Sequence, residues 1–163
     1  MTQYRYPTPA MVGDYLRAAF GLALTGTPLL MAPGGSFAFW ILGPLALLFA
    51  VFGLRTGLRH MTVVEADESR VASRHLWRRE LAWSEVTEVK LSYFSTKRDR
   101  RDGWMQLTLK SPGARIRFDS TLDGFGAITR RAHSTALAKG LELTDATIAN
   151  FASLGFQPPK SDL

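Results

Sequence analysis

The chain has 163 residues, no cysteine and a formal net charge of +6. The absence of cysteine excludes disulfides, thiolate metal sites, cysteine nucleophiles and thiol-linked lipid anchors. The positive excess is shared between an apolar N-terminal third and the polar remainder. Because a nucleic-acid-binding protein concentrates such charge on one module, we expect no nucleic acid among the partners.

Two apolar segments within residues 15–56 predict a hairpin of two transmembrane helices. The first runs from about residue 15 to 32 and the second from about residue 37 to 54. About 18 to 20 helical residues cross the hydrocarbon core of a bilayer. The link, Ala32-Pro33-Gly34-Gly35-Ser36, is an uncharged tight-turn sequence. A link this short permits only two antiparallel spans.

The charges at the ends of the hairpin predict its orientation. Arg5 and Arg17 precede the first span, Arg55 and Arg59 follow the second, and the link carries no charge. By the positive-inside rule we expect a multi-pass membrane protein with both termini in the cytoplasm. Residues 1–14 are then a cytoplasmic N-terminal segment.

Three other interpretations of the apolar segments stay open. A cleaved signal peptide fits poorly, because Pro33 follows Leu30-Met31-Ala32 and a second apolar segment comes later. A buried hairpin of a soluble protein is disfavoured, because the second segment is apolar all round. The first segment is also compatible with a re-entrant loop, since Pro28 can break a helix near its end.

Small residues spaced four apart mark candidate surfaces for helix packing. They are Ala19 and Ala23 in the first segment and Ala46 and Ala50 in the second. Such pairs allow close approach of two helices, although alanine is common in any apolar segment.

The pattern after residue 60 predicts a cytoplasmic domain over residues 60–155. Alternating apolar and polar residues predict five or six short strands. Their approximate ranges are residues 61–65, 71–76, 79–83, 88–93, 105–110 and 114–119. Each strand is apolar on one face only, which is typical of an antiparallel sheet with one solvated side.

The C-terminal part of this domain predicts two helices. Asp123 is expected to cap the first and Thr144 the second, while Gly140 and Gly155 stop them. Residues 156–163 predict a tail. The expected fold class is therefore α+β, a two-helix transmembrane hairpin followed by a bent antiparallel sheet closed by a C-terminal helix.

Four segments of the domain follow a shared pattern. They are Asp67-Glu68-Ser69, the stretch 79–86 with its Trp83-Ser84-Glu85-Val86 corner, the strand Arg115-Ile116-Arg117-Phe118, and Leu122-Asp123-Gly124-Phe125. Together with the two spans, this pattern resembles the bacterial pleckstrin-homology-like (PH-like) membrane proteins over residues 10 to 155. The resemblance implies a strongly bent antiparallel sheet, usually of seven strands, closed by a C-terminal helix. It also implies a binding platform in the bacterial cytoplasmic (inner) membrane, with no shared catalytic site.

The sequence offers no recognisable catalytic, metal or cofactor motif. His60, His75 and His133 have no second ligand at a metal-like spacing. Gly124-Phe125-Gly126 lacks the third glycine of a dinucleotide fingerprint, and no nucleophile elbow is present. We therefore expect no enzymatic activity, no catalytic residue, no metal and no cofactor.

The one concentrated charge feature lies in the predicted loop over residues 95–103. The candidate lipid or partner contacts are Lys97, Arg98, Arg100 and Arg101, with the neighbouring aromatics Tyr93, Phe94 and Trp104. Each cation near an anionic bilayer surface is attracted by about 1 kcal/mol. The alternative is an ordinary solvated loop. Arg78 and Arg79, and Arg115 with Arg117, would extend this basic surface.

These features lead to three functional hypotheses. The first is a non-enzymatic, membrane-anchored interaction module, an accessory subunit or assembly factor that docks on a larger integral membrane protein or complex. The second is a module that binds anionic phospholipid headgroups at the cytoplasmic surface. The third is a membrane-bound enzyme whose site is built from unfamiliar combinations of ordinary residues.

Overall fold

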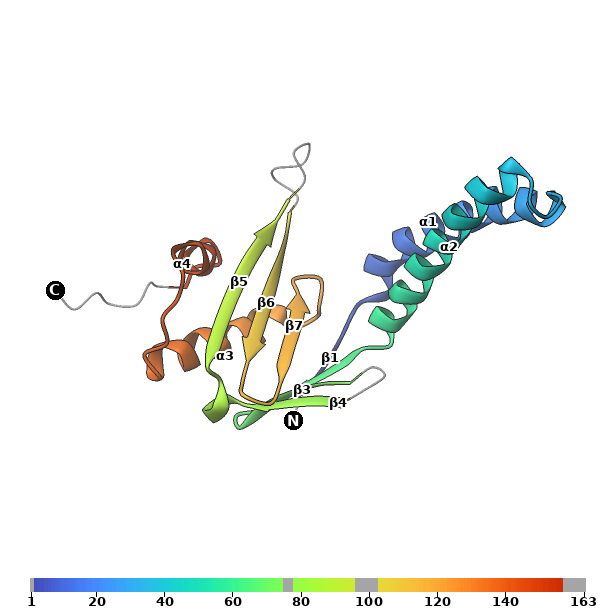
Figure 1. Cartoon of the computed structure of the whole chain (residues 1–163). Helices are drawn as coiled ribbons and strands as arrows, with labels where there is room; N and C mark the ends of the chain where they lie inside the picture. Colours follow the sequence, from blue (N-terminus) through green and yellow to red (C-terminus); the bar gives the residue numbers. More distant parts are fainter. Residues whose placement is uncertain (1, 75–77, 96–102, 157–163) are drawn as a thin grey trace. The chain divides into compact units, whose positions relative to one another are not determined.

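The computed structural model describes residues 2–74, 78–95 and 103–156 and divides the chain into two compact units. The helical unit comprises Tyr6–Thr62, and the sheet unit comprises Met1–Arg5 with Val63–Leu163. The described residues form four α-helices and two antiparallel sheets. The predicted α+β class is therefore confirmed (Figure 1).

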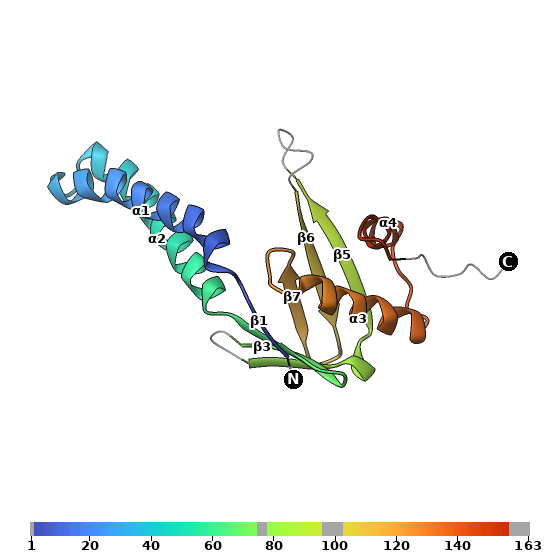
Figure 2. The ribbon, with the colours of Figure 1, turned by 180° about the vertical axis from the view of Figure 1, so that it is seen from behind.

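The helical unit consists of two helices of 24 residues each. Helix α1 runs over Thr8–Met31 and helix α2 over Phe37–His60. The Ser36 side chain begins α2 by accepting a hydrogen bond from the backbone N–H of Phe39, at 3.3 Å. The two helices lie side by side in both views (Figures 1 and 2). Both helices extend beyond the predicted ranges.

The contact between α1 and α2 depends on glycine at two positions. A Cβ on Gly21 would lie 2.2 Å from the ring of Phe49, and a Cβ on Gly53 would lie 3.2 Å from Cβ of Ala18. A larger side chain at Gly21 would therefore force the helices apart. Ala18 and Gly21 are buried, together with Met11 and Thr25 on the same helix.

The predicted packing alanines lie outside this contact. Ala19, Ala23 and Ala50 are exposed, and Ala46 is half-buried. Ala18 lies one residue before Ala19, and an α-helix turns by about 100° between neighbouring residues. The predicted alanine pairs therefore lie outside the buried residues of α1 and α2.

Polar contacts join the two chain segments at the end of the helical unit that lies away from the turn between α1 and α2. The Tyr15 hydroxyl lies 3.2 Å from Nδ1 of His60, and Oγ1 of Thr8 lies 3.4 Å from Nε2 of the same ring. The Arg59 guanidinium lies over the ring of Tyr6, 4.9 Å from its centroid. His60 therefore links the start of α1 to the end of α2.

Seven strands form the two sheets of the sheet unit. The first sheet has the order β1-β2-β3-β4, with β1 Thr2–Arg5, β2 Val63–Ala66, β3 Arg70–Arg74 and β4 Arg78–Ala82. The second has the order β5-β6-β7, with β5 Glu88–Phe94, β6 Trp104–Lys110 and β7 Arg115–Asp119. The 3₁₀ helix η1, Trp83–Glu85, joins them. Strand β1 was not predicted, and it pairs Tyr4 with Val64.

Two helices follow the strands. Helix α3 covers Phe125–Ala138 and helix α4 covers Asp145–Ser153. Gly124, and not Asp123, is the N-terminal cap of α3, and its φ of 75° is one that glycine adopts without strain. The cap of α4 is Thr144 as predicted, since its hydroxyl accepts a hydrogen bond from the N–H of Thr147, at 3.3 Å.

The core of the sheet unit lies where α3 crosses one face of the sheet β5-β6-β7 (Figure 2). The period-two pattern points alternate side chains of each strand inward. The fully buried large side chains include Val64, Val71, Leu81, Leu91, Leu107, Leu109, Phe118 and Phe151. From α3, Ile128, Ala132 and Ala136 are buried as well.

Helix α4 covers the open edge of β5. The Leu91 N–H donates to Oγ1 of Thr147 at 3.4 Å, and Nδ2 of Asn150 donates to the Leu91 carbonyl at 2.8 Å. An edge strand with unpaired backbone groups is a template for unwanted pairing, so this cover protects the second sheet.

We predict that Asn150→Ala destabilises the sheet unit by about 1 kcal/mol, because the Leu91 carbonyl loses its donor. Urea unfolding of the full chain in mild detergent measures the change. The control is Ser153→Ala, which removes an exposed hydroxyl of the same helix. Equal stability of the two variants would contradict the assigned role of Asn150.

Candidate functional site

Apolar side chains cover the outer surface of the helical unit. Phe20 on α1 is 71% exposed, and Trp40 and Leu54 on α2 are 70% and 66% exposed. Further exposed apolar residues of the two helices include Leu16, Leu24, Leu30, Phe37, Leu47, Leu48 and Val51. Soluble monomers rarely expose apolar patches of more than a few hundred Å². An apolar surface of this kind is typical of a region that contacts lipid or another protein.

The two helices differ in their suitability for crossing a membrane. Among the described residues, α2 is the one helix long and apolar enough to do so, and its apolar window is not buried. The helical unit therefore leaves this window of α2 uncovered. Helix α1 carries Asp14 and Arg17 near its start, and Thr25, Thr27 and Pro28 interrupt its second half. Length and composition thus support one of the two predicted spans.

The three predicted aromatic contacts lie together at one end of the β5–β6 hairpin. Tyr93, Phe94 and Trp104 are each exposed by 41–44%. The rings of Phe94 and Trp104 stack with centroids 5.4 Å apart, and the Tyr93 hydroxyl accepts a hydrogen bond from the N–H of Gly103, at 3.1 Å. The predicted basic contacts Lys97, Arg98, Arg100 and Arg101 lie outside the described residues.

A basic groove lies where strand β4 approaches strand β7. It has a volume of about 370 Å³, and it is lined by Ser73, Arg79, Arg115, Ile116 and Arg117. The Arg79 guanidinium donates to the backbone carbonyl of Arg115 at 3.2 Å, and so links the two sheets. The other two lining residues, Ile116 and Ser73, are buried.

The carboxylates near this groove are already engaged. Glu80 accepts from Arg70 at 2.6 Å and from Arg78 at 3.0 Å. The hydrogen bond from Arg70 is the main reason that the pKa of Glu80 lies below its usual value. Glu88, likewise, is paired with Lys110. Within the described part of the chain, Arg79, Arg115 and Arg117 are in no ion pair.

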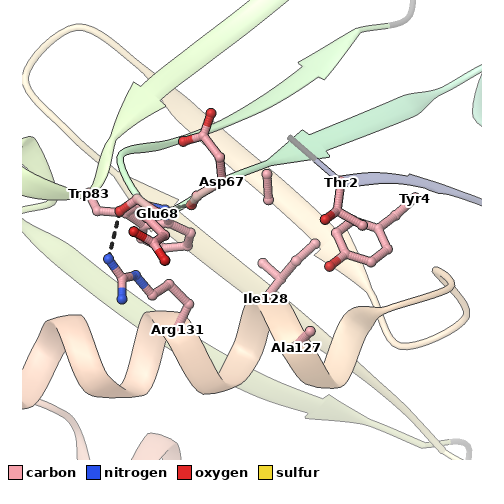
Figure 3. Close-up of a pocket in the computed structure, with 9 residues that line it drawn as sticks. Thr2, Tyr4, Asp67, Glu68, Trp83, Ala127, Ile128 and Arg131 are labelled. Atoms are coloured by element: carbon pink, nitrogen blue, oxygen red, sulfur yellow. Dashed lines mark hydrogen bonds between the residues drawn. The ribbon is translucent and has the colours of Figure 1, made fainter.

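A second pocket, of about 230 Å³, lies between the turn after β2 and helix α3 (Figure 3). Its lining residues are Thr2, Tyr4, Ala66, Asp67, Glu68, Trp83, Ala127, Ile128 and Arg131. Trp83 donates to the Asp67 carbonyl at 3.1 Å, and Arg131 donates to the Glu68 carbonyl at 2.6 Å. Both side chains thus brace the turn.

The carboxylate of Asp67 organises the same turn. It accepts hydrogen bonds from the hydroxyl and the N–H of Ser69, at 2.8 and 2.9 Å, and from the N–H of Arg70, at 2.9 Å. These bonds, the Ser69 hydroxyl foremost, lower the pKa of Asp67 from 3.8 to about 2. The folded turn therefore stabilises the charged form of Asp67.

The described residues provide few groups for catalysis. No cluster of three or more His, Asp or Glu side chains within them has a geometry for a metal ion. His133 is buried between the rings of Phe151 and Phe156, with centroids 4.8 and 5.4 Å away. His60 serves the ends of the helical unit, and His75 lies outside the described residues.

Comparison of the chain with protein-family models, with curated proteins and with solved structures finds no match in any of the three.

Sequence reasoning recognised the groove arginines only as additional basic surface. Arg79 and Arg115 are 36 residues apart in the sequence, and their meeting depends on how two sheets approach each other. The local signal was the alternation in β7, which places Arg115 and Arg117 opposite the buried Ile116 and Phe118. No local signal pairs that strand with β4.

We predict that Asp67 gives the sheet unit a stability that depends on acid pH. Because its folded pKa of about 2 lies below the ordinary value of 3.8, its contribution is complete above about pH 4 and is lost as the pH falls toward 2. The melting temperature of the full chain should therefore fall between pH 4 and pH 2, and it should fall less steeply in Asp67→Asn. In the control Glu142→Gln, at an exposed position, the melting temperature should keep more of its dependence on pH. An unchanged slope in Asp67→Asn contradicts the prediction.

Proposed function

We propose that this protein is a non-enzymatic, membrane-anchored interaction module of the bacterial cytoplasmic membrane. It acts as an accessory subunit or assembly factor that docks on a larger integral membrane protein or complex. The observation that carries the proposal is the exposed apolar surface of α1 and α2.

The distribution of charge supports a membrane location for these helices. Arg5 and Arg17, and Arg55 and Arg59, lie toward the ends of the helices that are remote from the turn, and the turn over residues 32–36 has no charge. If both helices cross the bilayer, this asymmetry places both termini in the cytoplasm. Asp14 forms an ion pair with Arg17 at 2.8 Å, which reduces the cost of placing both charges near an interface.

A partner for α1 supports the accessory-subunit role. A helix with charged and hydroxyl side chains is a weak span alone, and packing against other membrane helices can satisfy such groups. The contact with α2 uses Ala18 and Gly21, which leaves the small residues Ala19 and Ala23 exposed. We propose that this exposed pair contacts a helix of the partner protein.

The sheet unit supports the role of a binding platform. Six of its seven strands, β2 to β7, lie within the range of the resemblance to PH-like domains, and α3 packs against β5 and η1. We propose that the unit is a PH-like domain whose strongly bent sheets are closed by α3. Folds of this kind carry many different binding sites, so the partner has to be found by experiment.

The lipid-headgroup hypothesis has one observation in its favour. Tyr93, Phe94 and Trp104 are exposed together, and aromatic side chains favour the bilayer interface. The four basic residues of the adjoining loop would add attraction to anionic lipid. No arrangement among the described residues favours the third hypothesis, a membrane-bound enzyme.

We predict that Ala19→Leu/Ala23→Leu reduces recovery of the partner several-fold, because larger side chains prevent close helix approach. The tagged full chain is extracted in mild detergent, and bound proteins are quantified by mass spectrometry. The matched control is Ala10→Leu/Ala38→Leu, which enlarges exposed alanines near helix ends. The proposal fails if the unmodified chain is recovered as a monomer with no stoichiometric protein bound.

A further inference from the structure

We propose that the basic groove between β4 and β7 binds a phosphomonoester, the doubly charged phosphate group at the end of a small molecule or a lipid headgroup. This inference goes beyond the proposed docking function, and it does not depend on it. It rests on the groove's arginines, its volume and the absence of an acidic side chain from its described lining.

Two sheets contribute cations to the same space. Arg79 comes from β4, and Arg115 and Arg117 come from β7. A guanidinium presents paired N–H donors that match two phosphate oxygens, so arginine is well suited to this anion. Ser73 lines the same groove, and its hydroxyl is a neutral donor.

The position of Arg79 is determined by the fold. Its guanidinium is held 3.2 Å from the Arg115 carbonyl, while Ser73 lies opposite Arg79 in the β3–β4 register. Arg79 is therefore restrained by a bond across the sheets and has further N–H donors available. Such prior ordering lowers the entropic cost of binding an anion.

Positive charges are concentrated at the groove. Arg115 also lies directly opposite Lys110 in the β6–β7 register, and like charges at such positions destabilise a sheet. Lys110 is compensated by Glu88, and Glu80 is occupied by Arg70 and Arg78. A bound dianion would compensate the three groove arginines.

The dimensions of the groove favour a compact ligand. Its volume of about 370 Å³ accommodates a small phosphorylated molecule or a headgroup, and the three arginines line the same space. A phosphodiester or a carboxylate carries one charge and would compensate the three arginines less completely. The shared chemistry is thus a terminal phosphate, whether it is soluble or attached to a lipid.

The test uses the full chain in phosphatidylcholine nanodiscs, titrated with glycerol 3-phosphate in a calorimeter. We expect saturable binding, about tenfold weaker in Arg115→Gln and in Arg117→Gln, because each removes charge-assisted hydrogen bonds. Arg130→Gln, at an exposed position of α3 outside the groove, removes the same charge and should bind as the unmodified chain does. Circular dichroism checks that all variants are folded.

Two results would overturn the proposal. One is the absence of saturable binding by the unmodified chain, and the other is an equal loss of affinity in Arg130→Gln and the groove variants. A second arm repeats the titration in nanodiscs enriched in phosphatidic acid. Loss of glycerol 3-phosphate binding there assigns the groove to a lipid headgroup, and unchanged binding assigns it to a soluble phosphate. Neither arm depends on a docking partner, so its outcome is separate from that of the proposed function.

Discussion

Apolar side chains that remain exposed on two long helices are the constraint on which this protein depends. Burying one Leu or Phe side chain is worth about 1.5–3 kcal/mol, and Phe20, Trp40 and Leu54 are each about two-thirds exposed or more. In our proposal, lipid, partner helices or both bury these side chains. Our proposal of a membrane anchor with a docking partner follows from this requirement.

The sheet unit has no comparable requirement, because it forms its own core. Buried side chains from both sheets and from α3 fill its interior, and α4 covers the open edge of β5. Its surface is therefore available for binding. The three groove arginines are in no ion pair within the described part of the chain, which agrees with the proposed anionic ligand.

Patterns within single elements were predictable from the sequence. The alternation of Val89 and Leu91 with polar neighbours predicted β5, and Thr144 predicted the start of α4. Helix α2 was predicted from its uninterrupted apolar run, although it continues to His60 because Arg55 and Arg59 are compatible with a helix beyond an apolar core.

Features that depend on distant segments were not predictable. Strand β1 has only four residues, and it pairs with β2 although the sequence of the whole helical unit lies between the two strands. Gly124 replaces Asp123 as the cap of α3 because the positive φ of that position favours glycine. The groove between β4 and β7, likewise, depends on the approach of two sheets.

The most direct test of the central claim is the membrane topology of the helical hairpin. The chain has no cysteine, so Gly34→Cys in the turn and Ser153→Cys in α4 can each be labelled with an impermeant thiol reagent. A Cβ at Gly34 meets no neighbouring atom, so the substitution is tolerated. We predict that Gly34→Cys is labelled in intact cells and that Ser153→Cys is labelled only after the membrane is opened. Labelling of both positions only after opening would contradict a hairpin that crosses the membrane.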